Sequence, residues 1–149
     1  LAAAKIAAWS GVRAVIAAAG RPGVLADAVA DTPGVGTVVR PRAKRLGARK
    51  LWIAFAVGAK GVIVVDEGAR RALLERNVSL LAAGVGEVRG SFGVDDAVEL
   101  AGPDGTPFAK GLVRLDAVTL ATLAGRRTSE LPDGIPHEVV HRDDLVVLP

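Results

Sequence analysis

One segment near the end of the chain has the spacing of a zinc-binding motif. Residues 137–141 read H-E-V-V-H, and in zinc proteases H-E-x-x-H lies on a helix that brings both imidazoles to one metal, with Glu as general base. Here Pro136 precedes the motif, and Val139 and Val140 favour a strand. In a strand, residues four apart stand about 13 Å apart, too far for two Zn–N bonds of about 2.1 Å. We therefore predict a surface strand and assign no metal ligand to His137 or His141.

Glycines and acidic residues also fall short of an active-site pattern. Gly84, Gly86 and Gly90 miss the dinucleotide-binding spacing by one residue, and Ser91 has Arg89 where a nucleophile elbow has glycine. The acidic residues often come in adjacent pairs, whose side chains point apart in a helix or strand, so we interpret these as caps and turns: Asp66-Glu67, Asp95-Asp96 and Asp143-Asp144. We assign no catalytic, cofactor-binding or metal-binding residue to this chain.

A basic segment lies about one third of the way along the chain. Residues 40–50 hold six Lys or Arg and no acid. Such a run can neutralise phosphates and so contact RNA or another anion; the alternative is a solvated linker or a patch that faces an acidic neighbour. The candidate contact residues are Arg40, Arg42, Lys44, Arg45, Arg49 and Lys50.

Composition limits the remaining classes of protein. The chain has 149 residues, enough for one ordinary domain or two small ones, and its lack of Cys excludes a disulfide scaffold and a thiolate metal site. No apolar run approaches the roughly 18 residues that span a bilayer, so we predict no membrane partner. Residues 1–61 carry a net charge of +8 and residues 62–149 a net charge of −5, which suggests two units. Because the chain starts at Leu1 and contains no Met, we expect a piece of a longer protein.

The first part of the chain alternates helix and strand patterns. An alanine-rich run favours a helix over residues 1–10, with Ala2, Ile6 and Trp9 on one face. We expect a buried strand over 12–18, a helix over 24–30 and a strand over 36–39, which is an α/β arrangement. A helix over 50–57 should carry Trp52 and Phe55 inward.

Shorter elements follow from residue 61 onward. We predict a strand over 61–65, a helix over 67–76 capped by Asp66, and a helix over 116–124 that begins with Asp116. Short strands are expected over 79–81, 86–91, 97–100 and 107–114, with a turn at residues 103–105 and a strand pair or extended tail over 138–148. Short strands with regular turns indicate a small β-barrel. The predicted regions are therefore 1–46, a basic linker and connecting helix over 47–60, and a barrel with a C-terminal tail over 61–149.

The order of several short segments resembles a known family. The barrel region is similar to a PUA domain, and the whole chain resembles the C-terminal part of the bacterial glutamate 5-kinase family, in which the end of an amino-acid-kinase domain precedes a PUA domain. The resemblance implies an α/β remnant of the kinase sheet followed by a small mixed β-pseudobarrel with short helices. It departs from the family at Asp95-Asp96, where Gly-Asp is common, and at Leu115, where an aromatic residue is frequent. The matching segments are 16–25, 36–37, 65–69, 79–85, 88–92, 108–111 and 140–144.

The resemblance implies a function for the parent enzyme. Members of the family use ATP and Mg²⁺ to phosphorylate the side-chain carboxylate of L-glutamate, the first step of proline biosynthesis, in the cytoplasm. The family's nucleotide motif, Gly-Gly-Met-x-Thr/Ser-Lys, would precede Leu1, and the glutamate-binding residues lie further upstream. We therefore expect this chain to be inactive alone, and the helix over 1–10 to direct its N-terminus toward the nucleotide. The parent is expected to be a homo-oligomer.

Two other functions stay open at this point. A free-standing PUA-type RNA-binding module would use the basic segment to contact phosphates, although the net negative charge of residues 62–149 opposes this. A structural or oligomerisation piece would leave part of a sheet exposed in residues 1–46, which should then associate.

Overall fold

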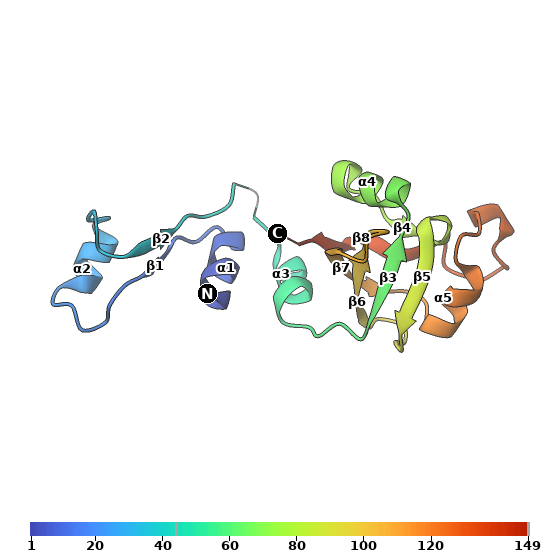
Figure 1. The fold of residues 1–149 in the computed structure, drawn as a ribbon, viewed down its shortest axis with the longest axis horizontal. Helices are drawn as coiled ribbons and strands as arrows, with labels where there is room; N and C mark the ends of the chain where they lie inside the picture. Colours follow the sequence, from blue (N-terminus) through green and yellow to red (C-terminus); the bar gives the residue numbers. More distant parts are fainter. Residues whose placement is uncertain (44, 149) are drawn as a thin grey trace. The chain divides into compact units, whose positions relative to one another are not determined.

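Figure 1 shows the computed structural model, which describes residues 1–43 and 45–148. The contacts within it divide the chain into two compact units, Leu1–Leu51 and Trp52–Pro149. Lys44, one of the candidate phosphate contacts, lies outside the described residues.

The first unit alternates helices and strands in the predicted order. It contains α1 (Ala2–Trp9), β1 (Ala14–Ile16), α2 (Val24–Val29) and β2 (Thr37–Val39). The two strands pair antiparallel, with Ala14 opposite Val39. The prediction that the strand after α1 is buried is wrong, because Ile16 is exposed and the other two residues of β1 are only half-buried. A sheet of two strands has few neighbours to cover it.

Helix α3 (Ala48–Phe55) begins two residues before its predicted start. The expectation that Trp52 points inward is wrong: half of its surface is exposed, and the fully buried residue of this helix is Ile53. One residue turns a helix by about 100°, so choosing the larger apolar side chain as the inward one placed the buried face one position too early. Phe55 is half-buried.

The second unit is a curled mixed sheet with short helices (Figure 1). Its strand order is β4-β8-β7-β6-β3-β5, in which β3 and β6 are parallel and every other pair is antiparallel. The 3₁₀ helix η1 (Ala82–Gly84) joins the edge strands β4 and β5 directly, so both edges of the sheet are tied together. The strands are β3 (Gly61–Val65), β4 (Leu80–Leu81), β5 (Val85–Gly90), β6 (Ala97–Ala101), β7 (Pro107–Val113) and β8 (Glu138–Val147).

The helices of this unit begin at the predicted caps. Helix α4 (Glu67–Arg76) starts where the Asp66 carboxylate accepts a hydrogen bond from the Ala69 N–H, and α5 (Ala117–Leu123) starts where Asp116 accepts one from Thr119. A short 3₁₀ helix, η2 (Thr128–Glu130), lies between α5 and β8. These caps satisfy N–H groups that a helix cannot satisfy itself. Residues 138–147 form one strand that pairs with β4 and β7, so the segment is neither the strand pair nor the extended tail that was expected.

The core of the second unit lies between the curled sheet and helices α4 and α5. It includes Leu115, at the position where an aromatic residue is frequent in the family that the sequence resembles, and Phe92 and Phe108 are the buried aromatic residues. Lys110 is also buried, and its ammonium group donates a hydrogen bond to the carbonyl of Val57. Among the described residues, we find no helix of the length and hydropathy that a membrane crossing requires.

Candidate functional site

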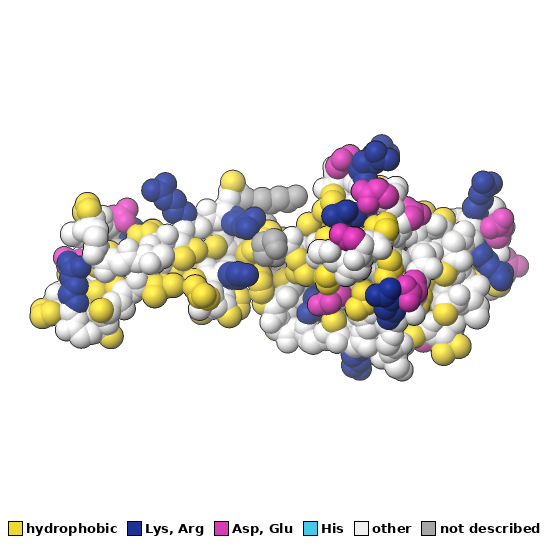
Figure 2. Space-filling model, viewed as in Figure 1, with side chains coloured by type: hydrophobic (Ala, Val, Ile, Leu, Met, Phe, Trp, Pro, Cys, Tyr) yellow, Lys and Arg dark blue, Asp and Glu magenta, His cyan; other side chains and the backbone are white. Residues whose placement is uncertain are grey.

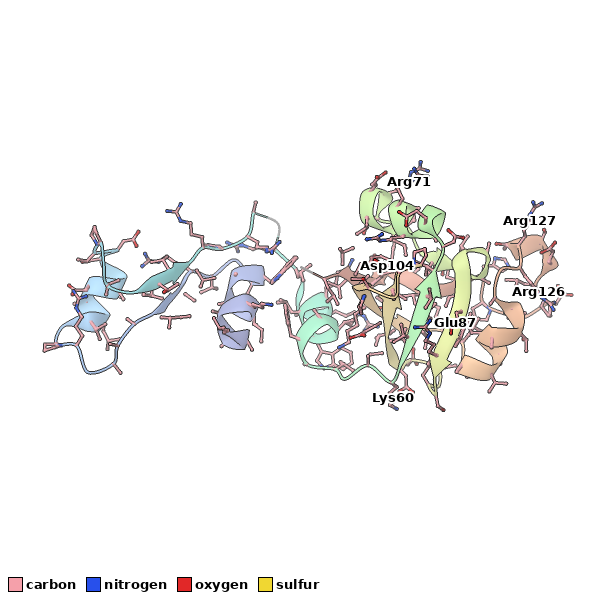
Figure 3. All side chains as sticks on the ribbon, in the orientation of Figure 1. Lys60, Arg71, Glu87, Asp104, Arg126 and Arg127 are labelled. Atoms are coloured by element: carbon pink, nitrogen blue, oxygen red, sulfur yellow. The ribbon has the colours of Figure 1, made fainter. Side chains whose placement is uncertain are left out.

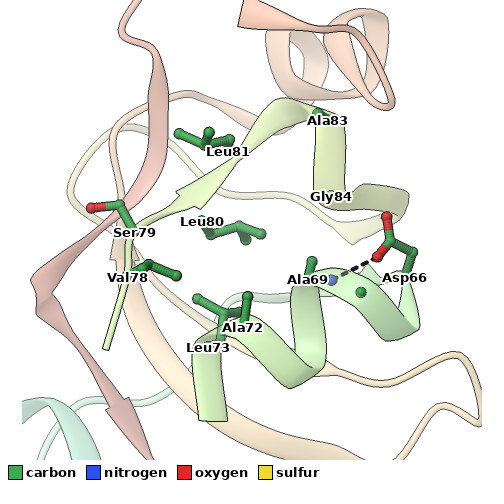
Figure 4. Close-up of a pocket in the computed structure, with 11 residues that line it drawn as sticks. Asp66, Ala69, Ala72, Leu73, Val78, Ser79, Leu80, Leu81, Ala83 and Gly84 are labelled. Carbon is green, nitrogen blue, oxygen red and sulfur yellow. Dashed lines mark hydrogen bonds between the residues drawn. The ribbon is translucent and has the colours of Figure 1, made fainter. Parts of the chain in front are cut away.

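A pocket of about 490 Å³ lies between α4 and the segment that leads from it to β5 (Figure 4). One wall is the N-terminal half of α4, and the other is residues 78–84, which include β4 and η1. Figure 4 shows Ala69 and Ala72 of α4 facing Leu80 across the pocket. The lining residues are Asp66, Gly68, Ala69, Ala72, Leu73, Val78, Ser79, Leu80, Leu81, Ala83 and Gly84.

Small side chains bring the two walls close together. Gly84 packs so near α4 that a Cβ atom there would lie 2.5 Å from the Cβ of Ala69. Leu73 and Leu80 are buried and close the inner end of the pocket, whereas Val78 and Leu81 keep more than a third of their surface exposed. The pocket therefore has an apolar floor and an accessible rim.

The polar groups around the pocket already have partners. The Asp66 carboxylate accepts from the Ala69 N–H at 2.7 Å. The Ser79 hydroxyl donates to the Glu138 carboxylate at 3.2 Å and accepts from the Arg142 N–H at 3.1 Å. Figure 4 shows this hydroxyl on the side of the chain away from α4, just before β4. Recognition in the pocket would therefore rest on shape and apolar contact.

Sequence reasoning missed this pocket, although a pattern for it exists. Gly68, Ala69 and Ala72 recur on one face of the helix, and Ala83 and Gly84 follow shortly after it. Small residues at helical spacing indicate close approach of another segment, but the pattern does not identify that segment. The contact joins residues that are distant in sequence.

Charges of both signs are interspersed on the visible face of the second unit (Figure 2). Lys60 and Asp96 form an ion pair at 2.7 Å, and that hydrogen bond, with one from the Gly93 N–H, holds the pKa of Asp96 below its ordinary value. Figure 3 shows Arg71 on α4 and Arg127 beyond α5 pointing away from the sheet. On this face the described charges do not form a continuous basic surface of the kind that tracks a nucleic-acid backbone.

The predicted basic segment is partly committed to contacts within the first unit. The Arg42 guanidinium stacks over the Trp9 ring, 4.3 Å from its centroid, and the Arg45 side chain packs against Gly11. Arg40 is exposed just after β2, and Arg49 and Lys50 lie in the first turn of α3. The structure does not gather the five described candidates around one site, and contact of the six candidates with RNA or another anion stays a prediction.

Residues 138–141 of the H-E-V-V-H segment lie in a strand, as predicted, but the expectation of a surface strand is wrong, because β8 lies between β4 and β7 and both Val139 and Val140 are fully buried. His137 lies just before β8, whereas His141 lies within it, 3.5 Å from the Asp143 carboxylate and 3.8 Å from that of Glu138. Glu138 also pairs with Arg114 at 3.0 Å. Among the described residues, no group of three or more His, Cys, Asp or Glu side chains has a metal-binding arrangement.

A second hollow, of about 570 Å³, lies in the first unit beside the start of α2. Arg21 lines it and is held by the Asp27 carboxylate at 3.0 Å and the Gly34 carbonyl at 3.2 Å. Leu25 lines it as well and is four-fifths exposed.

Residues 61–135 match the PUA domain family. Among solved structures, a PUA domain from Aeropyrum pernix K1 determined as a tartrate complex is 35% identical, with a TM-score of 0.42 over 50% of this chain and 41% of that one. A conserved PUA domain protein from Thermoplasma acidophilum is 20% identical, with a TM-score of 0.41 over 68% of this chain and 60% of that one.

Curated relatives match almost the entire chain. The glutamate 5-kinase of Mycobacterium avium (strain 104) is 46% identical over 143 residues, 96% of this chain and 38% of that protein. The glutamate 5-kinase of Mycobacterium tuberculosis (strain H37Rv) is 46% identical over 99% of this chain and 38% of its own length. That of Rhodococcus jostii (strain RHA1) is 44% identical over 99% of this chain. The chain spans about 38% of the length of the first two relatives.

Proposed function

Because this chain belongs to the PUA domain family, and because its relatives are glutamate 5-kinases along nearly its full length, we propose that it is the C-terminal part of such an enzyme. The observation that carries the proposal is the 46% identity over 99% of the chain, which includes the unit before the PUA match. The parent enzyme would transfer the γ-phosphoryl group of ATP to the side-chain carboxylate of L-glutamate, in the cytoplasm, as the first step of proline biosynthesis.

The first unit supports this proposal through the surface it leaves uncovered. Ile16 in β1 and Leu25 and Val29 in α2 are exposed, the latter two by about four-fifths. A sheet of only two strands cannot bury these side chains. A larger sheet, with more strands and with helices packed on it, would bury them. We infer that residues 1–46 form the closing segment of an amino-acid-kinase domain and that the second unit is its appended PUA domain.

The chemistry of the parent would then depend on residues outside this chain. Phosphoryl transfer relies on positioning and on the stabilisation of developing negative charge by lysines, Mg²⁺ and backbone N–H groups. Among the described residues there is no group of three or more His, Cys, Asp or Glu side chains placed to hold a metal ion. In this proposal α1 follows the nucleotide loop, and its N–H groups point toward the phosphates.

The test compares this chain with the same chain joined to the coding region upstream of Leu1. We expect γ-glutamyl hydroxamate from glutamate, ATP and hydroxylamine only with the joined protein. That region should encode Gly-Gly-Met-x-Thr/Ser-Lys, and replacing its lysine with Met should abolish the product. Hydroxamate formation by the 149-residue chain alone would show that the chemistry does not lie upstream.

An RNA-binding role is the second candidate, favoured by the PUA match and by the exposed Arg40 at the start of the basic segment. It predicts binding to structured RNA whose affinity falls steeply with salt, because phosphate contacts release counterions. A gel shift with a structured RNA across a salt series tests it. Binding that is undetectable at low ionic strength would remove this candidate.

A further inference from the structure

The C-terminal end of α1 is closed by residues that come much later in the sequence. The last four carbonyls of an α-helix have no partner within the helix. Here the Ile6 carbonyl accepts from the Ser10 N–H and the Ala7 carbonyl from the Val12 N–H, a local ending that the positive φ of Gly11 permits. The Ala8 carbonyl accepts locally from the Gly11 N–H at 3.2 Å and takes a second donor from a distant residue, and the Trp9 carbonyl also takes a donor from a distant residue.

The two distant donors are the backbone amides of Arg42 and Leu46 in the basic segment, and we name these two residues together with Arg45 the strap. The Arg42 N–H donates to the Ala8 carbonyl at 2.9 Å, and the Leu46 N–H donates to the Trp9 carbonyl at 3.0 Å. Both amides belong to an irregular stretch between β2 and α3, so these bonds fix that stretch against the helix end.

Side chains reinforce the same contact. The Arg42 guanidinium lies over the Trp9 ring, which is half-buried beneath it. The Arg45 side chain occupies the space beside Gly11, where any Cβ atom would collide with it, its Cδ lying 2.7 Å from that position. Two arginines therefore place positive charge at the C-terminus of α1, the end at which the helix dipole favours cations.

We propose that the strap positions α1, so that Arg42 and Trp9 are positioning residues for the nucleotide in the parent kinase. This rests on the proposed function, since it is there that α1 follows the nucleotide loop. The strap holds one end of an eight-residue helix whose other end would face the phosphates. Loosening the strap lets the helix fray from its C-terminus, and its N–H groups lose their fixed direction.

The first test uses the 149-residue chain and does not depend on kinase activity. In a Trp52→Phe background Trp9 is the remaining tryptophan, and the matched variants are Arg42→Met and Arg40→Met. Only Arg42→Met should alter Trp9 emission and raise amide exchange at Leu46, by about 3-fold, the factor that an exposed cation–π contact is worth. If the amides of both Arg42 and Leu46 exchange without protection in the 149-residue chain without substitutions, the proposed contact between the strap and α1 is wrong.

The second test measures steady-state kinetics of the joined protein described above. Arg42→Met should raise the KM for ATP by about 3-fold with little change in kcat. Arg42→Lys should raise this KM less, because it keeps the positive charge, and Arg40→Met should leave it unchanged. A purely structural role would lower the amount of active enzyme and leave KM alone. Equal effects of Arg42→Met and Arg40→Met on KM would overturn the positioning role. An inactive joined protein would instead refute the proposed kinase function, with amide exchange still reporting on the strap.

Discussion

Gly84 ends η1 directly against α4, and the space there is too small for any side chain. A Cβ atom at Gly84 would lie 2.5 Å from the Cβ of Ala69 and 3.5 Å from a methyl carbon of Leu80. The Ala69 methyl is fixed to the helix backbone, so α4 itself must shift to relieve the collision. Gly84→Ala therefore forces apart the two walls of the pocket.

The expected cost follows from the kind of contact. Overpacking a fitted site by one methyl typically costs 1–3 kcal/mol, so we expect a loss of about 2 kcal/mol in the free energy of unfolding. Ala69→Gly should cost about 1 kcal/mol, chiefly through helix propensity. In the double variant the second methyl is gone and the collision disappears. Its total cost should therefore be about 1 kcal/mol, with a coupling of about 2 kcal/mol between the positions.

Urea unfolding of the four proteins, followed by far-ultraviolet circular dichroism, measures these values. Equal m-values are needed for the comparison of free energies. Gly86→Ala is the matched control, because its Cβ would meet only the Val64 carbonyl oxygen at 3.6 Å, an ordinary contact. If the costs of Gly84→Ala and Ala69→Gly simply add, or if Gly84→Ala costs no more than Gly86→Ala, the close packing described for this pocket is wrong.

Three further predictions concern the second unit. Asp66→Ala removes the cap of α4 and should cost about 1 kcal/mol in urea unfolding; a cost below about 0.3 kcal/mol would count against the cap. Leu120→Ala opens a cavity at a fully buried core position and should cost about 3 kcal/mol, whereas Leu74→Ala on the exposed side of α4 should cost far less in the same assay. Hydrogen bonds from Thr119 hold the pKa of Asp116 below its ordinary value, so its contribution to stability is complete above about pH 4 and is lost as the pH falls further. In the Asp116→Asn variant the urea midpoint should depend less on pH between pH 4 and 2 than it does in the unsubstituted chain. An equal pH dependence in the two proteins would refute this.

Local signals predicted much of the second unit. Asp66 and Asp116 precede helices that start where they should, because a cap is a contact among neighbouring residues. Residues 103–105 turn the chain between β6 and β7, where the Asp104 carboxylate accepts from the Thr106 N–H. Each of these features is decided within a few residues, so the sequence is enough to find it.

Features built from distant segments escaped prediction. The parallel pairing of β3 with β6 and the position of β8 between β4 and β7 depend on which strands meet, and strand patterns do not encode partners. The pocket was missed for the same reason. The run of charge that makes Arg42 and Arg45 candidate phosphate contacts is visible in the sequence, whereas the helix end against which they pack is not.

The place of β8 in the sheet also bears on how the protein is made. A ribosome synthesises β8 after every other strand of the sheet, yet β8 lies between β4 and β7. Until residues 138–147 have left the exit tunnel, β4 has no neighbour, β7 has an open edge, and the core lacks Val139, Val140 and Leu145. Until then the nascent second unit exposes apolar surface, and this state favours aggregation or chaperone binding. The second unit can therefore complete its sheet only after β8 has left the exit tunnel.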